Sequence, residues 1–141
     1  MGITPTHNCL YFTANALSRL IGKMADDAFA PTGLSPAHAF LMMLVNDRPG
    51  ISQKELAEAL SLAPSTVTRF VDALERRGFL TREMEGKLSR VSPTEAGLGL
   101  KETIAAGWSR LHALYSEELG AEAAEELTRA IDDANQQLEM V

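Results

Sequence analysis

The stretch that decides the fold is residues 52–80, which read SQKELAEALSLAPSTVTRFVDALERRGFL. It opens with a capping-box pattern, because Ser52 is followed three positions later by Glu55 and each side chain can bond a free backbone N–H. A short helix is therefore predicted to begin here. After a turn of three or four residues, a second helix is predicted from Pro64 to Arg77. Two short helices joined by such a turn predict a helix-turn-helix.

The second helix of this pair has an apolar side and a polar side. Apolar residues recur at positions i, i+3, i+4 and i+7, which is typical of a buried face: Val67, Phe70, Val71 and Leu74. The polar side begins with small hydroxyl side chains and one long cation. Hydroxyl groups can approach phosphates closely, and an arginine can bind guanine through two parallel hydrogen bonds. The predicted DNA contacts on this helix are Ser65, Thr66, Thr68 and Arg69. An ordinary amphipathic surface helix would show the same pattern.

The pattern changes from helical to strand-like after Gly78, which is the expected left-handed residue at a helix end. Two strand-like segments, 79–82 and 88–91, lie on either side of a turn at 85–87. A hairpin that follows a helix-turn-helix predicts a wing. Two basic residues of this wing are further predicted DNA contacts: Lys87 and Arg90.

Helical patterns lie on both sides of this central region. Ser35-Pro36 resembles a helix start, and the run 40–45 that follows is apolar nearly all round, so a buried helix is predicted there. Long apolar stripes at helical spacing run through 8–28 and 94–140. They carry more apolar surface than a monomer of this layout could easily cover, which favours self-association. The alternative is that these helices close on the core of their own subunit.

The predicted fold is therefore mainly α with a small β wing. A winged helix-turn-helix lobe covers residues 35–93, and a helical dimerisation region covers 8–28 and 94–140 within a single domain of 141 residues. The net charge of the chain is −6. Residues 61–92 hold six basic and four acidic residues, whereas the rest of the chain holds seven basic and fifteen acidic residues. One basic face on an acidic body is consistent with steering of DNA to that face.

Several function classes find no support in the sequence. There is no Ser/His/Asp arrangement, phosphate-binding glycine loop or pair of carboxylates in an apolar setting, so no enzyme is predicted. The single Cys9 excludes an intrachain disulfide, and the histidine spacing does not support a metal site. No cofactor is predicted either. Because no stretch approaches the roughly 20 apolar residues that cross a bilayer, a soluble cytoplasmic protein without membrane contact is expected.

The run from Leu56 to Leu80 closely resembles the MarR family, a family of winged helix-turn-helix transcriptional regulators. The later Ser92-Pro93-Thr94-Glu95-Ala96-Gly97 is similar to the wing exit of that family, LTxxG, with Pro93 in place of leucine. This resemblance implies an obligate homodimer whose terminal helices intertwine and whose two recognition helices bind successive major grooves of a pseudo-palindromic DNA duplex. It also implies repression. The Asp-x-Arg of the usual family wing is absent, which puts minor-groove readout in doubt.

The same resemblance suggests an effector that releases the protein from DNA, either a small molecule or an oxidant. Cys9 lies where the peroxide-sensing OhrR-like branch places its reactive cysteine, although the matching stretch 34–40 lacks the tyrosines of that branch. A small buried apolar residue is the alternative for Cys9. Small-molecule contacts are predicted in a crevice of the dimer, with core packing as their alternative: Phe12, His38, Met42 and Trp108.

A different kind of function remains open, in which an acidic winged helix serves as a protein–protein interaction module without operator binding. Salt dependence separates the two cases, because DNA binding releases counterions and weakens steeply as the salt concentration rises.

Overall fold

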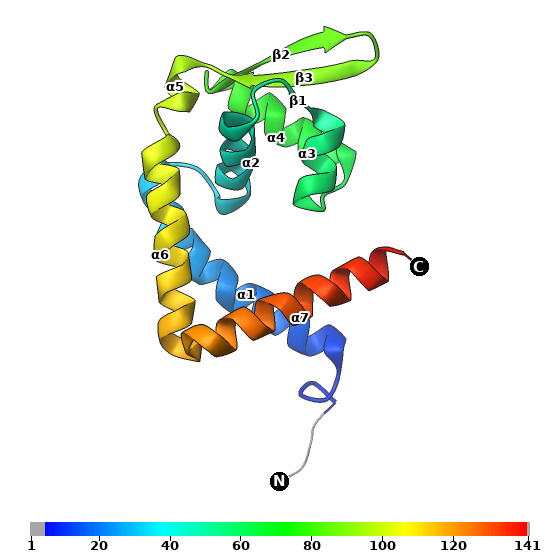
Figure 1. Ribbon diagram of the computed structural model, residues 1–141, viewed down its shortest axis with the longest axis vertical. Helices are drawn as coiled ribbons and strands as arrows, with labels where there is room; N and C mark the ends of the chain where they lie inside the picture. The colour runs from blue at the N-terminus through cyan, green and yellow to red at the C-terminus, as the bar shows by residue number, and fades with distance from the viewer. Residues whose placement is uncertain (1–4, 141) are drawn as a thin grey trace. The chain divides into compact units, whose positions relative to one another are not determined.

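The computed structural model describes residues 5–140 and is mostly helical, with one small antiparallel sheet (Figure 1). The elements follow one another as α1 (Leu10–Phe29), the short 3-10 helix η1 (Ala30–Thr32), α2 (Pro36–Asp47), β1 (Ile51–Ser52), α3 (Gln53–Leu60), α4 (Pro64–Arg76), β2 (Leu80–Glu85), β3 (Leu88–Pro93), α5 (Glu95–Leu98), α6 (Lys101–Leu119) and α7 (Ala121–Glu139). The predicted fold class, mainly α with a small β wing, is confirmed.

The contacts divide the chain into two compact units. The winged unit is Phe29–Trp108. The terminal-helix unit joins the two ends of the chain, up to Ala28 and from Ser109 onward. Among the described residues no single helix is long and apolar enough to cross a membrane, although the bent pair Leu10–Thr32 and Pro36–Asp47 together has the length and composition.

The helix ends in the winged unit are set by local hydrogen bonds. The Ser35 hydroxyl accepts from the backbone N–H of His38 at 3.2 Å, and Pro36 occupies the first turn of α2. Both bonds of the capping box at α3 are present at 3.1 Å, between Ser52 and Glu55. Beyond α4, Gly78 has φ +82°, and the N–H groups of Gly78 and Phe79 each bond a carbonyl in the last turn at 3.0 Å. This is the Schellman arrangement that terminates a helix.

The sheet of the winged unit has the order β1-β3-β2, and all of its pairs are antiparallel. The β2–β3 hairpin runs in register from Leu80 opposite Pro93 to Glu85 opposite Leu88. Its two-residue turn begins at Gly86 with φ +63°, which fits a type II′ hairpin. Each strand has six residues, two more than the pattern predicted, and the short third strand β1, paired to β3, was not predicted at all.

The core of the winged unit lies between α2, α3, α4 and the sheet. Val67, Val71 and Leu74 of α4 are fully buried, as their spacing predicts. Phe70, which was assigned to the same face, is only half-buried. The centroid of its ring lies 4.4 Å from the centroid of the His38 ring. The other large side chains with almost no exposure in this unit are Phe29, Leu41, Met42, Val45, Leu56, Leu80, Val91 and Ile104.

The apolar stripe predicted through 94–140 does not begin as one continuous helix, because the structure has the short α5 followed by α6. A side chain at Gly97 would overlap the carbonyl oxygen of Phe79 and lie 2.9 Å from Cε of Met42. Thr94 fixes this segment, because its hydroxyl donates to the Gly78 carbonyl at 2.6 Å and accepts from the N–H of Gly97 at 3.1 Å. The chain is thus held against the start of β2 before α6 begins.

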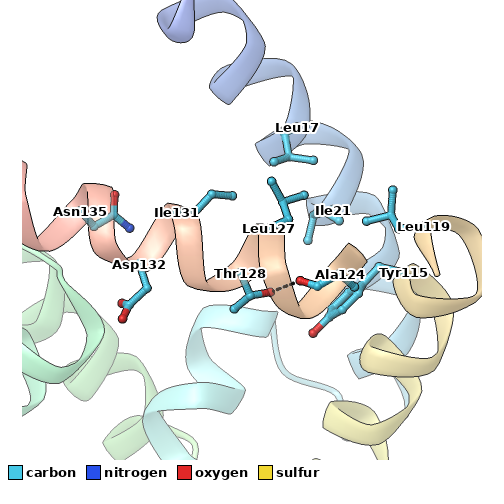
Figure 2. Close-up of a pocket in the computed structure, with 10 residues that line it drawn as sticks. All are labelled: Leu17, Ile21, Tyr115, Leu119, Ala124, Leu127, Thr128, Ile131, Asp132 and Asn135. Carbon is cyan, nitrogen blue, oxygen red and sulfur yellow. Dashed lines mark hydrogen bonds between the residues drawn. The ribbon is translucent and has the colours of Figure 1, made fainter. Parts of the chain in front are cut away.

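The terminal-helix unit contains α1 up to Ala28, the second half of α6 and all of α7. A groove of about 840 Å³ runs between α1 and α7 and is lined mainly by apolar residues, among them Leu10, Leu17, Leu127 and Ile131. A smaller hollow of about 340 Å³ adjoins it, where Leu127 faces Leu17 and Ile21 of α1 while Asp132 points away (Figure 2). Many apolar side chains of this unit are therefore only partly covered.

Candidate nucleic-acid interface

The amino-terminal half of α4 offers exposed polar groups. Pro64 occupies the first turn, and Ala63 before it provides no side-chain cap. Ser65 and Arg69 are exposed, and Thr66 is half-buried. The Arg69 guanidinium donates to the Thr66 hydroxyl at 3.4 Å, a long bond that leaves most of its donors available. The structure therefore places three of the predicted DNA contacts together on one accessible turn.

Thr68 is exposed as well, but its hydroxyl is engaged within the chain. The hydroxyl donates to the carbonyl of Pro64 at 3.1 Å and accepts from Nε2 of Gln53 at 3.2 Å. Gln53 lies at the start of α3, and its Oε1 accepts from the hydroxyl of Ser89 on β3 at 2.6 Å. Neither Gln53 nor Ser89 was among the predicted site residues, since their sequence context carries no sign that they meet Thr68.

The two predicted wing residues differ in their surroundings. Lys87 is exposed in the turn at the tip of the hairpin. Arg90 contacts its own chain, because its Nε donates to a carboxylate oxygen of Glu85 at 2.6 Å and Nη1 donates to the Gly50 carbonyl at 3.0 Å. Lys87 is thus the freer of the two cations for a phosphate contact.

Arg82 was not predicted to belong to the site, yet it joins the wing to α4. Its Nη2 lies 2.6 Å from Oδ1 of Asp72 and 2.9 Å from Oε1 of Glu75, both on α4. The hydrogen bond to Glu75 is the main cause of a raised pKa for Arg82, with the bond to Asp72 adding to it. The two carboxylates, which would repel DNA phosphates, are thereby partly neutralised within the winged unit.

The predicted effector residues divide between the two units. Cys9 is exposed rather than buried, and its carbonyl accepts from the N–H of Thr13 at 3.0 Å at the start of α1. Phe12 is 47% exposed and Trp108 is 42% exposed, so neither is a core residue of the single chain, whereas Met42 is fully buried.

His38 is half-buried at the start of α2. Its Nδ1 lies 2.7 Å from the Ser35 hydroxyl, and its Nε2 is buried without a hydrogen-bond partner. Burial, and then the charge of Arg77, lower the pKa of His38. Across residues 5–140, no cluster of His, Cys, Asp or Glu side chains is arranged to hold a metal ion.

The sequence comparisons address the same region. The family model described as MarR family matches residues 34–85, which include α2, α3, α4 and β2. Residues 34–85 of this chain thus match the MarR family. The HTH-type transcriptional repressor YetL of Bacillus subtilis (strain 168) is 28% identical over 118 residues, covering 77% of this chain and 71% of YetL.

Two further proteins resemble this chain. The uncharacterized HTH-type transcriptional regulator YybA of B. subtilis (strain 168) is 26% identical over 84 residues, but the match spans only 57% of the chain and 56% of YybA. The repressor CouR bound to a 23-mer DNA duplex has the same fold, with a TM-score of 0.79 at 20% identity over 96% of this chain and 98% of CouR. The structure of CouR from Rhodococcus jostii RHA1 bound to p-coumaroyl-CoA has a TM-score of 0.76 at 22% identity. That match covers 96% of this chain and 95% of CouR.

Proposed function

We propose that this protein is a member of the MarR family, a sequence-specific DNA-binding transcriptional regulator that acts as a homodimeric repressor in the cytoplasm, and not an enzyme. The observation that carries the proposal is the exposed first half of α4, where Ser65 and Arg69 stand free of strong intrachain bonds. Such a helix presents donors to the base edges of a major groove. CouR, which has the same fold, was solved bound to a 23-mer DNA duplex, and this supports DNA binding by a protein of this fold.

Dimerisation is proposed from the apolar surface of the terminal-helix unit. Nine of the thirteen large apolar residues that are exposed among the described residues lie in this unit, and a groove of about 840 Å³ runs between α1 and α7. Contiguous apolar patches of this kind mark protein interfaces. A second copy of the chain fits best, because a two-fold dimer presents two recognition helices to a pseudo-palindromic duplex.

Repression and release by an effector are proposed from the relatives. YetL is named a repressor, and CouR was crystallised with p-coumaroyl-CoA. For this chain, Phe12, His38 and Trp108 are the proposed small-molecule contacts, and the exposed thiol of Cys9 is the proposed target if the effector is an oxidant. Loss of operator binding on treatment with an organic hydroperoxide, abolished in Cys9→Ser, would single out the oxidant.

The test of the main proposal is selection from a randomised duplex library, followed by titration of the enriched duplex at several salt concentrations. We expect one pseudo-palindromic sequence and an affinity that falls steeply as the salt concentration rises. Arg69→Ala should reduce preference for the enriched duplex by about 1–3 kcal/mol. Lys87→Ala should weaken binding to all duplexes about equally and lower the salt slope by about 1.

Arg110→Ala, an exposed arginine of α6, is the matched control and should bind like the wild type. The alternative is a winged helix that binds another protein. It is favoured if no sequence is enriched and binding to duplex DNA does not depend on salt. If Arg69→Ala and Lys87→Ala both bind the enriched duplex like the wild type, the assignment of contacts is wrong.

A further inference from the structure

Three side chains from three elements form a continuous hydrogen-bonded chain beside the recognition helix α4. The Ser89 hydroxyl of β3 donates to Oε1 of Gln53 on α3 at 2.6 Å. Nε2 of the same amide donates to the hydroxyl of Thr68 on α4 at 3.2 Å, and that hydroxyl donates to the Pro64 carbonyl at 3.1 Å. The wing and the recognition helix are thus connected through a single side chain.

The bond from Thr68 to the Pro64 carbonyl sets the direction of these hydrogen bonds, because a carbonyl oxygen can only accept. An amide has one accepting oxygen and one donating nitrogen, so Gln53 can accept from Ser89 and donate to Thr68 at the same time. A hydroxyl has one proton, and Thr68 uses its proton on the carbonyl of Pro64. Thr68 therefore has no proton to donate to a base edge while these hydrogen bonds are intact.

Gln53 is well placed for this role, because its backbone is fixed at the first position of α3. The residue before it, Ser52, is buried, forms both bonds of the capping box and belongs to the strand β1 that pairs with β3. Gln53 itself is half-buried. Its side chain thus starts from a rigid point and spans to both neighbours.

We infer that Gln53 is a positioning residue, which holds the wing and the recognition helix at a fixed separation, and that Thr68 acts through Gln53 rather than by reading a base. This inference rests on the proposed DNA-binding function and deepens it. Arg82 supplies a second link from the other strand of the wing, to Asp72 and Glu75. These two links join the wing to different turns of α4, in addition to the core packing of its buried residues.

The first test uses the free, full-length protein and measures amide hydrogen exchange. Gln53→Met keeps the size of the side chain and removes both hydrogen bonds. We expect about threefold to tenfold faster exchange at two places, the first two turns of α4 and the strand β3. Gln136→Met, on the exposed surface of α7, is the matched control and should leave both segments unchanged. Faster exchange confined to the start of α3 would overturn the inference.

The second test separates positioning from base reading. Gln53→Met, Thr68→Val and Ser89→Ala are each used to select duplexes from the randomised library, after thermal unfolding has verified their fold. We expect all three to enrich the wild-type sequence with a common affinity loss of about threefold to tenfold. Because the bonds form one chain, the double variant Gln53→Met/Thr68→Val should lose no more than either single variant.

A changed base preference at one position in Thr68→Val alone would overturn the inference, since Thr68 would then read that base. Additive losses in the double variant would overturn it too. If the wild type enriches no sequence while the exchange result holds, the proposed function fails and the link between wing and recognition helix stands.

Discussion

The winged unit and the terminal-helix unit differ in how fully their apolar side chains are buried. Fifteen of the nineteen buried apolar residues among the described residues lie in the winged unit, whereas nine of the thirteen large exposed ones lie in the terminal-helix unit. Burial of apolar surface is the main favourable term in folding. The winged unit therefore contains most of what it needs to fold, and the terminal-helix unit needs further apolar cover.

The difference extends to the polar groups. In the winged unit, side-chain bonds join different elements, as in the links of Gln53 and Arg82 to α4. In the terminal-helix unit, several side-chain bonds stay within one helix, such as those from Thr128 to the Ala124 carbonyl and from Gln136 to Asp132. Bonds of this kind do not join helices, so we expect packing between helices, and on the proposed partner subunit, to contribute to the rigidity of this unit.

The largest expected effect comes from placing a charge on the apolar side of α7. Ile131→Asp would put an unpaired carboxylate into the proposed dimer interface, which costs several kcal/mol. We expect the dimer dissociation constant to rise at least about 100-fold, and operator binding to fall with it. Sedimentation velocity over a range of concentrations measures the change.

Gln136→Asp on the opposite side of α7 is the control for Ile131→Asp and should leave the dimer intact. If Ile131→Asp stays dimeric, the terminal-helix unit covers its apolar residues by itself and the contrast between the units disappears.

The second prediction concerns two glycines, one in each unit. Gly97→Ala would force a methyl group against the Phe79 carbonyl and Met42, so we expect the winged unit to lose about 2 kcal/mol or more in the free energy of unfolding. Gly22 of α1 has no atom within 4 Å of the position of an added Cβ, and Gly22→Ala should be neutral or slightly stabilising. Thermal and denaturant unfolding compare the two. An equal loss in both variants would show that a partner subunit packs closely on Gly22.

The third prediction sharpens the comparison within the winged unit. Arg82→Met removes the two bonds to α4, and we expect a loss of about 1 kcal/mol or less in unfolding free energy, because both carboxylates are more than a third exposed. Affinity for the enriched duplex should fall several-fold, since carboxylates released from Arg82 would repel the phosphates of bound DNA. Arg48→Met removes the exposed pair with Glu55 and should change neither quantity measurably. Equal effects of the two substitutions would argue against a special role for Arg82.

The smallest effect is expected from pH. The pKa of His38 is lowered in the folded protein, so the unfolded chain takes up a proton first as the pH falls below the ordinary value of 6.5. The unfolding free energy should be unaffected by His38 above this pH and should fall below it, by less than about 1 kcal/mol because the ring is only partly buried. His38→Gln should flatten this part of the stability curve. An unchanged slope would show that other groups control it.

The features of the fold that were predicted correctly depend on neighbours in the sequence. The capping box at Ser52, the end of α4 at Gly78 and the turn at Gly86 involve bonds over only a few residues. The break between α5 and α6 could not be predicted from neighbours in the sequence, and the segment before it packs Gly97 against the carbonyl of Phe79, eighteen positions away. The strand β1 was missed because it pairs with residues forty positions later.

The candidate site divides in the same way. The exposed side of α4 could be predicted from its period, and Ser65 and Arg69 lie where that period places them. The role of Gln53 could not be predicted, because it forms hydrogen bonds to residues 15 and 36 positions away. A glutamine at the start of a helix carries no sequence signal for such bonds. Whether each predicted residue contacts DNA is decided by the selection experiments.

The register of the β2–β3 hairpin allows the length of the wing tip to change without a change at the base of the hairpin. Pairing is fixed at the base, where Leu80 lies opposite Pro93, and the turn itself is only Gly86 and Lys87. Residues added in equal number to both strands at the tip would extend the hairpin rung by rung, without moving Ser89 or Arg82 to the other face. A single residue added to one strand would instead create a bulge. The wing can therefore be lengthened or exchanged as a module, in evolution or by grafting, while the reading helix keeps its place.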